Sequence, residues 1–291
     1  MIRILITGAT GNIGVELIDY LNNLSTNSIS FVAVRNIEKA KISFKKYPNL
    51  GYRKFNFDNK NSYLQAFEQI DILFLLRPPH ISSSKEVFYP LLKAAKKSGI
   101  QKVVFLSVQG AEKSKFIPHY KIEKIIQELQ LEYIFVRPSY FMQNLTTTLL
   151  PEILNKQHIY LPSGNAKFNF IDVKNIAEVT AQLLLKFDDY KGKAYEITGA
   201  ENKNFTEVVK IISKITGLKM RFKNVNPILF YIRKLKDGFE RDYALVLTIL
   251  HFIPRLLAAP IISDNYKKIT GNNPISIKEF ILREKKNLCL L

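Results

Sequence analysis

The segment that decides the fold is Thr7-Gly8-Ala9-Thr10-Gly11-Asn12-Ile13-Gly14, which follows the apolar run from Ile2. It joins an expected strand to an expected helix. Its first glycine permits a tight turn, its second lets the backbone approach a pyrophosphate, and its third lets the helix pack closely. An ordinary strand-turn-helix junction is the alternative. We predict a dinucleotide-binding loop, whose cofactor contacts are Gly8, Thr10, Gly11, Asn12, Ile13 and Gly14.

Outward from this loop, short apolar runs alternate with helical patterns, as in βαβ units on a parallel sheet. The expected strands are 2–7, 30–34, 53–57, 72–76, 103–107 and 133–137. The expected helices are 13–23, 36–46, 61–69, 85–98 and 119–129. This order predicts an α/β fold of the Rossmann type, with a doubly wound parallel sheet.

The alternation weakens after Pro138. Strand and helix patterns recur at 168–185 and 194–215, and residues 226–291 are mostly helical with Pro and Gly breaks. We expect a dinucleotide-binding core over residues 1–150, with returning segments near 168–200. A smaller, interleaved and mostly helical substrate-side portion would occupy residues 201–291.

Composition excludes a disordered or fibrous chain. The 291 residues are 47% hydrophobic and 23% charged, which suits a soluble globular protein. The net charge of +18 raises the possibility of nucleic-acid binding. The excess is spread evenly, at +9 for residues 1–150 and +9 for 151–291. We therefore expect no nucleic-acid partner, and nucleic-acid binding ranks third among the candidate functions.

Cysteine and metal chemistry have little support. Cys289 has no second cysteine to pair with, and the four histidines, at 80, 119, 158 and 251, are scattered without metal-ligand spacing. The N-terminus lacks the features of a signal peptide, so a cytoplasmic location is expected. The longest apolar run, Tyr243 to Ile262, is interrupted by prolines and Arg255 and suggests buried helices or a pocket cover. We expect no metal and no membrane partner.

The residue after the second expected strand indicates which dinucleotide binds. NAD usually meets an acid there, whereas an arginine accommodates the 2′-phosphate of NADP. Here the residue is Arg35, and Lys39 adds a second cation. Glu38 lies in the first turn of the next helix, where acids are common because of the helix dipole. We predict NADP(H); a solvated cation at the start of a helix is the alternative for Arg35.

Further cofactor contacts are expected at the carboxyl ends of the other strands, where ligands of doubly wound sheets bind. Phe57 could line the adenine site and Asp58 could hydrogen-bond there, unless Asp58 is only a turn residue. The remaining candidates follow the fourth and fifth expected strands: Leu76, Arg77, Pro78, Ser107 and Val108.

These residues resemble the NmrA-like group of atypical short-chain dehydrogenase/reductases, which includes type 2 NADPH:quinone reductases and triphenylmethane reductase. The resemblance spans nearly the whole chain. The matching segments are TGATGNIG at 7–14, VAVRNIEKA at 32–40, HYKIEK at 119–124, VRPSYFMQN at 136–144, IDVKNIAEV at 171–179, YEITGAE at 195–201 and KITGNNPISIKEF at 268–280. The resemblance implies NADPH, a Rossmann core and a cleft closed by the C-terminal part. The group also contains members that sense NADP without catalysis.

Two neighbouring residues compete for the catalytic position. Tyr120 and Lys124 spell the YxxxK motif of short-chain dehydrogenases, in which a Tyr acid is assisted by a Lys. Alignment on Glu123 instead places His119 where relatives carry the Lys of the motif, so that YxxxK is out of phase by one residue. A neutral His119 at the helix start could donate or relay a proton. A partly exposed histidine that pairs with Glu123 is the alternative.

Tyr140, Phe141 and Asn144 follow the sixth expected strand and would lie at the nicotinamide end, where aromatic rings suit a flat acceptor. Core aromatics are the alternative. We expect an NADPH-dependent reductase that transfers hydride to a flat, quinone-like small molecule, and the chain could form a homo-oligomer. A non-catalytic NADP-sensing regulator is the second candidate function.

Overall fold

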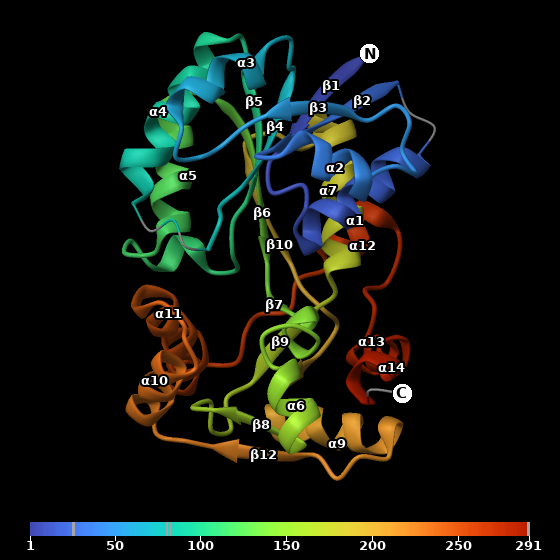
Figure 1. The fold of residues 1–291 in the computed structure, drawn as a ribbon, viewed down its shortest axis with the longest axis vertical. Coiled ribbons are helices and arrows are strands. Elements are labelled where there is room, and N and C mark those ends of the chain that lie inside the picture. The colour runs from blue at the N-terminus through green and yellow to red at the C-terminus, as the bar shows by residue number, and fades with distance from the viewer. Residues whose placement is uncertain (25–26, 80, 82, 290–291) are drawn as a thin grey trace. The chain divides into compact units, whose positions relative to one another are not determined.

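The computed structural model describes residues 1–24, 27–79, 81 and 83–289, and it forms two compact units (Figure 1). Unit 1 consists of Met1–Pro138, Val173–Ile197 and Asn265–Gly271. Unit 2 consists of Ser139–Asp172, Thr198–Asp264 and Asn272–Leu291. The chain therefore passes between the units several times, whereas the expected domain limits were residues 150 and 201.

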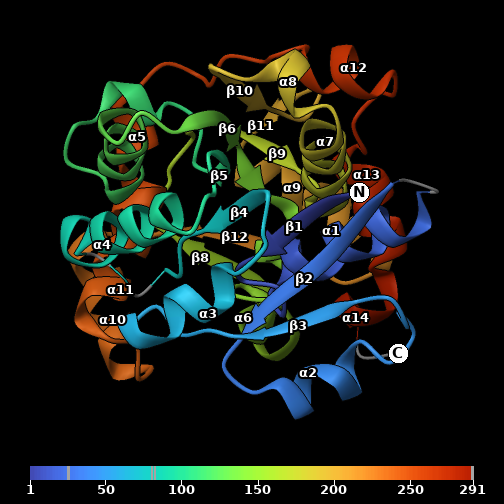
Figure 2. The ribbon, with the colours of Figure 1, turned by 90° about the horizontal axis from the view of Figure 1, so that it is seen from above.

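Unit 1 is built on a sheet of seven parallel strands in the order β10-β6-β5-β4-β1-β2-β3, seen from above in Figure 2. Its strands are β1 Ile2–Ile6, β2 Ser28–Val34, β3 Gly51–Lys54, β4 Ile72–Leu76, β5 Lys102–Leu106, β6 Glu132–Pro138 and β10 Lys193–Ile197. The order reverses between β1 and β4, where ligands of doubly wound sheets bind. The predicted Rossmann fold is confirmed.

Helices cover both faces of this sheet. Figure 1 shows α3, α4 and α5 on one face and α1, α2 and α7 on the other. The helical segments of unit 1 are α1 Asn12–Asn23, α2 Ile37–Ser43, η1 Lys60–Ser62, α3 Tyr63–Phe67, α4 Ser84–Lys97, η2 Ala111–Lys113, α5 Pro118–Glu128, α7 Val173–Leu185, α8 Phe187–Tyr190 and α12 Asn265–Thr270. The inward faces of α3, α4 and α5 bury Phe67, Phe88 and Ile126 against Phe105 and Phe135 of the sheet. This burial of large apolar side chains is the main source of stability for the unit.

One strand differs from its predicted position. The sequence predicted a strand at Arg53–Phe57, but β3 covers Gly51–Lys54. The chain turns at Asn56, whose side-chain oxygen accepts a hydrogen bond from the Asp58 backbone amide at 3.2 Å. Asn and Asp favour such side-chain-to-backbone turns over a strand. Phe57 and Asp58 consequently lie in the loop after β3.

Unit 2 contains two small sheets, of order β11-β9-β7 and β12-β8. Its strands are β7 Tyr140–Phe141, β8 His158–Leu161, β9 Phe168–Ile171, β11 Asn202–Lys203 and β12 Arg221–Asn224. Its helical segments are η3 Met142–Leu145, α6 Leu150–Lys156, α9 Phe205–Thr216, α10 Pro227–Lys236, α11 Arg241–Phe252, η4 Ile253–Leu256, α13 Ile277–Arg283 and α14 Lys285–Cys289. A capping box at Asn204 and Glu207 begins α9, and Gly217 ends it. Of these strands, the sequence predicted only β9.

Candidate cofactor and catalytic site

The loop between β1 and α1 has the geometry of a phosphate cradle. Gly8 adopts a left-handed conformation with φ of 64°, which favours glycine. The Gly11 amide donates a hydrogen bond to the Gly8 carbonyl at 3.0 Å and closes the turn. Helix α1 then begins with no side-chain cap and no acidic residue in its first turn. Its amide donors and dipole favour an anion at this position.

The glycines of the loop serve different purposes. A Cβ on Gly14 would lie 2.6 Å from the Ala9 Cα and closer still to the Gly8 carbonyl oxygen, so only glycine lets α1 approach the loop. A Cβ on Gly11 would meet only the Gly8 carbonyl oxygen, at 3.3 Å. Thr10, Gly11 and Asn12 are exposed, whereas Ile13 is buried. The loop therefore presents Gly11 toward open space.

Thr7 joins the two strands at the point where the sheet order reverses. Its buried hydroxyl donates to the Phe74 carbonyl at 3.1 Å and accepts from the Leu76 amide at 2.9 Å. Leu76 packs beneath Gly8, since a Cβ there would lie 3.0 Å from a methyl carbon of Leu76. The sequence alone did not indicate these contacts of Thr7, although a hydroxyl residue at the end of a buried strand usually needs a hydrogen-bond partner.

Arg35 lies at the carboxyl end of β2 and is exposed. Among the described residues it forms no ion pair or side-chain hydrogen bond. The neighbouring acid, Glu38, pairs instead with Lys41 at 3.0 Å. Asn36 caps α2 by accepting a hydrogen bond from the Lys39 backbone amide at 2.9 Å, and the Lys39 side chain, in the first turn of α2, is exposed. Two cations are therefore available to an anion here.

The loop after β3 carries the predicted adenine-site residues. Phe57 is half-buried and packs edge-on against Phe55, with ring centroids 4.9 Å apart. Its carbonyl accepts a hydrogen bond from Tyr63. Asp58 is exposed. The ring of Phe57 is thus held by the core.

Arg77 follows β4 and is held by the backbone of its own loop. Its Nη1 donates to the carbonyls of Pro78, Pro79 and Ile81, the last at 2.6 Å. Its buried Nε has no hydrogen-bond partner, and no carboxylate among the described residues pairs with it. Burial lowers the pKa of Arg77 from its ordinary value. The half-buried Pro78 therefore supplies one of the carbonyl groups that hold a cation without an acidic partner among the described residues.

Ser107 ends β5 and is 1% exposed. Its amide donates to the Val136 carbonyl at 2.7 Å, but its buried hydroxyl has no hydrogen-bond partner. Such a group is rare in a folded protein and is often satisfied by a ligand or water. Val108, the next residue, is half-buried.

His119 lies in the first turn of α5, directly after Pro118 at the first helical position. Its ring faces Phe105 of β5, with centroids 6.1 Å apart. Burial, together with a smaller effect of the Arg77 guanidinium, lowers the pKa of His119 to about 3. His119 is therefore neutral at physiological pH, because both its burial and the nearby Arg77 disfavour a protonated ring.

The alternative pairing of His119 with Glu123 does not occur. Both oxygens of the buried Glu123 accept hydrogen bonds from Arg137 of β6, at 2.9 and 2.6 Å. Arg137 also pairs with Glu112 at 2.5 Å. Glu123 thus holds α5 on the sheet through Arg137. This ion pair was not predictable from the pattern of α5 because its basic member, Arg137, lies on β6.

Tyr120 and Lys124, the residues of the YxxxK motif, lie on a different side of α5 from His119. Lys124 is exposed, lies 5.7 Å from the centre of the Tyr120 ring, and donates to Gln127 at 3.1 Å. The two side chains therefore contact each other, and the ammonium of Lys124 bonds toward the C-terminal end of the helix. Tyr120 itself is half-buried.

The three residues predicted to form a substrate pocket belong to unit 2. Tyr140 packs in an aromatic cluster, with its ring centroid 5.4 Å from Phe168 and 5.3 Å from Phe170. Its hydroxyl bonds to Nε2 of His251 at 2.9 Å. This arrangement fits the core-aromatic alternative for Tyr140. Phe141 and Asn144 are half-buried.

His251 is a buried neutral group in this cluster. Its Nδ1 lies 2.7 Å from the Leu247 carbonyl, which can only accept, so Nδ1 carries the hydrogen and Nε2 accepts from Tyr140. Burial lowers the pKa of His251 to about 4, although the hydrogen bond to Leu247 opposes this effect.

We expect the free energy of unfolding to fall as the pH is lowered from about 6.5 toward 4, because the unfolded chain protonates His251 before the folded chain does. This residue contributes a slope of about 1.4 kcal/mol per pH unit in that window and none above it. Urea titrations of wild type and His251→Gln at several pH values measure the difference. Equal slopes for the two proteins would contradict the assignment.

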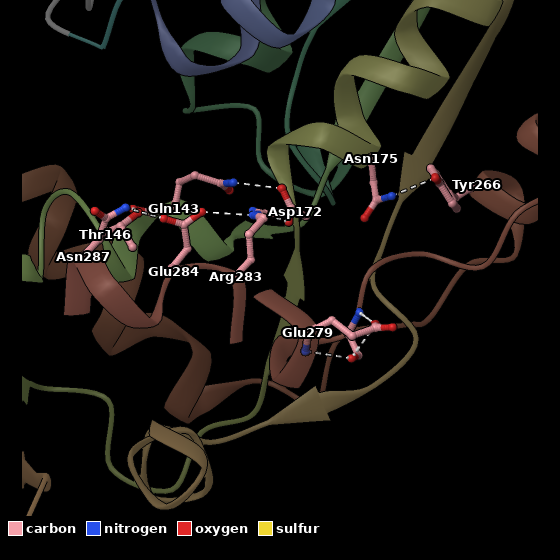
Figure 3. A network of polar contacts seen from close by, with 10 residues as sticks. Gln143, Thr146, Asp172, Asn175, Tyr266, Glu279, Arg283, Glu284 and Asn287 are labelled. Atoms are coloured by element: carbon pink, nitrogen blue, oxygen red, sulfur yellow. Dashed lines mark hydrogen bonds and ion pairs between the residues drawn. The ribbon is translucent and has the colours of Figure 1, made fainter. Parts of the chain in front are cut away.

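A second polar network of unit 2 centres on the fully buried Asp172 (Figure 3). Gln143 donates to its Oδ1 at 2.8 Å, and Arg283 of α13 lies 2.8 Å from its Oδ2. Glu284 accepts from the Nε of Arg283 at 3.0 Å. Within unit 1, Asn175 donates to the Tyr266 hydroxyl at 2.7 Å, also drawn in Figure 3. These contacts hold elements together within each unit.

Within residues 1–24, 27–79, 81 and 83–289, no three His, Cys, Asp or Glu side chains are grouped so that they could hold a metal ion. Over the same residues, no helix is both long and apolar enough to cross a bilayer. His80, one of the four histidines considered above, lies outside the described residues.

Comparison with known proteins gives a family match over most of the chain. The sequence model described as "NmrA-like family" matches residues 2–254. Prestalk A differentiation protein A of Dictyostelium discoideum is 27% identical, over 95% of this chain and 90% of its own length. The NAD(P)H azoreductase of Xenophilus azovorans is 26% identical, over 95% of this chain and 96% of its own length.

Among solved structures, the NADPH-dependent quinone oxidoreductase of Escherichia coli in complex with NADPH has a similar fold. The TM-score is 0.82 at 19% sequence identity, and the match covers 96% of this chain and 99% of the other. At this identity the likeness concerns the fold.

Proposed function

Because the chain belongs to the NmrA-like family, we propose that it is an NADPH-dependent reductase whose acceptor is a flat electrophile of the quinone or dye type. The observation that carries the proposal is the combination of two features of unit 1. An open glycine loop precedes the uncapped helix α1, and Arg35 has no acidic partner in the part of the chain that the structure describes. The quinone oxidoreductase and azoreductase relatives support the acceptor class.

The residues present fit NADPH. A pyrophosphate suits the Gly8–Gly14 loop, where α1 offers uncapped amides. A 2′-phosphate suits Arg35 and Lys39, since Glu38 is already paired. The orphaned hydroxyl of Ser107 and the unpartnered Nε of Arg77 are donors that a bound polar group would satisfy.

NADPH supplies a hydride when it is bound, so the protein needs to orient the acceptor and exclude water. His119 remains neutral and offers one ring N–H as a hydrogen-bond donor. Its neutrality follows from burial and from Arg77, which both disfavour a second positive charge. We assign His119 to proton donation or relay, and Tyr120 to the edge of the site.

We expect His119→Ala to lower the turnover number about tenfold or more, whereas Tyr120→Phe changes it little, because that variant loses only a hydroxyl. Steady-state kinetics with NADPH and a soluble quinone test this. Turnover should show no titration of His119 between about pH 5 and 8, since the pKa of this residue is near 3. A large loss confined to Tyr120→Phe would show that the literal YxxxK motif operates.

Mixing the purified protein with NADPH and a panel of quinones and dyes distinguishes a reductase from an NADP-sensing regulator. A reductase consumes NADPH only when an acceptor is present. An NADP-sensing regulator binds NADPH without consuming it.

A further inference from the structure

Unit 2 carries an exposed apolar face that the proposed function does not use. Nineteen large hydrophobic side chains of the described residues are exposed, and twelve of them fall between residues 228 and 262. They are Ile228, Leu229, Ile232, Leu245, Val246, Ile249, Leu250, Ile253, Leu256, Leu257, Ile261 and Ile262. We call these twelve residues the apolar face. Proteins that remain monomeric in water rarely expose so many apolar side chains together.

The apolar face is produced by the two packed helices α10 and α11 and the segment that follows them, shown in orange and red in Figure 1. In α11 the side chains of Ala244, Leu247, Thr248 and His251 are buried. The opposite side of the same helix is also apolar, and no Asp, Glu, Lys or Arg occurs from Tyr243 to Pro254. The apolar run therefore does not consist only of buried helices, which was one of the two interpretations that the sequence suggested.

The exposure of apolar side chains is not limited to the outer sides of the packed helices, as Leu256 and Leu257 show. They lie at the end of η4 and just after it, and their side chains are 68% and 65% exposed. Ile261 in the same irregular segment is 67% exposed. Burying each such side chain in an apolar environment is favourable, so this segment gains free energy from an apolar partner.

Unit 2 also carries four basic side chains, which we call the basic cluster, and three of them precede the apolar face closely in sequence. Strand β12 presents the exposed Arg221 and Lys223, and α10 begins three residues after β12 ends. Together with Lys156 and Lys219, these side chains line one surface hollow that no acidic residue lines. None of the four forms an ion pair among the described residues.

We propose that unit 2 docks on an anionic lipid bilayer, with the apolar face in the acyl boundary and the basic cluster at the headgroups. Apolar side chains next to Lys and Arg are the pattern of proteins that lie on a membrane without crossing it. A chain with net charge +18 has charge complementarity with an anionic surface. A second copy of the chain would bring the same charge and the same basic cluster.

This inference replaces the expectation from the sequence of no membrane partner; peripheral docking needs no spanning helix. If the proposed function also holds, docking would give the enzyme access to quinones dissolved in the bilayer. That consequence rests on the proposed function, whereas docking itself does not.

The test is flotation of the purified full-length protein with vesicles of phosphatidylcholine alone and of phosphatidylcholine mixed equally with phosphatidylglycerol. We expect binding to the anionic vesicles that weakens with added salt. The variant Leu256→Ser/Leu257→Ser should weaken it about tenfold or more. The variant Arg221→Gln/Lys223→Gln should weaken it about fivefold for each cation removed.

The control variant Ile42→Ser/Leu64→Ser removes two exposed apolar side chains from unit 1 and should bind vesicles like the wild type. Thermal unfolding of every variant confirms that it is folded. Absence of wild-type binding to anionic vesicles would overturn the proposal. So would a wild-type dimer in light scattering that Leu256→Ser/Leu257→Ser dissociates without any change in vesicle binding.

Reduction of a water-soluble quinone separates docking from the proposed function. Leu256→Ser/Leu257→Ser should retain this activity while it loses vesicle binding. If this double variant lost quinone reduction but still bound vesicles, the apolar face would be a substrate-binding surface, and the docking proposal would be overturned. Vesicle binding by a wild type that reduces no quinone would leave docking supported and contradict only the reductase.

Discussion

Replacement of Gly11 by Val is expected to abolish NADPH binding, with a loss in affinity of about a hundredfold or more. The branched side chain would fill the space into which the loop opens, where a phosphate would otherwise approach the backbone amides. The fold should survive, because a Cβ at this position meets only the Gly8 carbonyl oxygen, at 3.3 Å, and Gly11 has an ordinary negative φ of −84°. Isothermal calorimetry with NADPH measures the loss.

The neighbouring Gly14 provides the contrast. Gly14→Ala places a methyl group 2.6 Å from the Ala9 Cα and should lower the free energy of unfolding by about 1 to 3 kcal/mol. Gly11→Val should change it by about 1 kcal/mol or less. A folded Gly11→Val protein with wild-type affinity for NADPH would show that the loop is an ordinary strand-turn-helix junction.

Arg35→Asp is expected to weaken NADPH binding about a hundredfold relative to NADH binding, because a carboxylate would repel the 2′-phosphate that the guanidinium is proposed to bind. NADH lacks that phosphate, so its affinity should change little. Arg35 has no ion pair among the described residues, and its replacement should therefore leave the fold intact.

Lys45→Asp is the matched control, since Lys45 is exposed just after α2 and its replacement changes the net charge equally. It should affect the two dinucleotides alike. Equal losses of NADPH and NADH affinity in Arg35→Asp, measured by calorimetry, would contradict the assignment of the 2′-phosphate.

The fold of unit 1 was predictable because its signals are local. Apolar runs buried on both faces mark β1, β4 and β5, and the glycine loop marks the first crossover. Strand β3 was misplaced because the turn at Asn56 competes with an apolar run that continues to Phe57. In unit 2, β7 and β11 are two residues long, and β8 pairs with β12 some sixty positions away, so they leave little local pattern.

The candidate site was likewise predictable only where its residues belong to one local segment of the chain. The loop glycines and Arg35 could be proposed as cofactor contacts from spacing alone, since the proposal depends only on their positions directly after a strand. The ion pair of Glu123 with Arg137 and the hydrogen bond of Tyr140 with His251 join residues far apart in sequence. No single-element pattern contains both partners, so the sequence suggested a pairing of Glu123 with His119 that tertiary packing overrides.

The most direct measurement follows nicotinamide absorbance when the purified protein is mixed with NADPH and a soluble quinone. We predict a loss of absorbance that requires both protein and quinone, is faster with NADPH than with NADH, and disappears in Gly11→Val. Tight binding of NADPH without turnover across quinones and dyes would contradict the reductase and favour an NADP-sensing regulator. Failure to bind either dinucleotide would contradict the cofactor site itself.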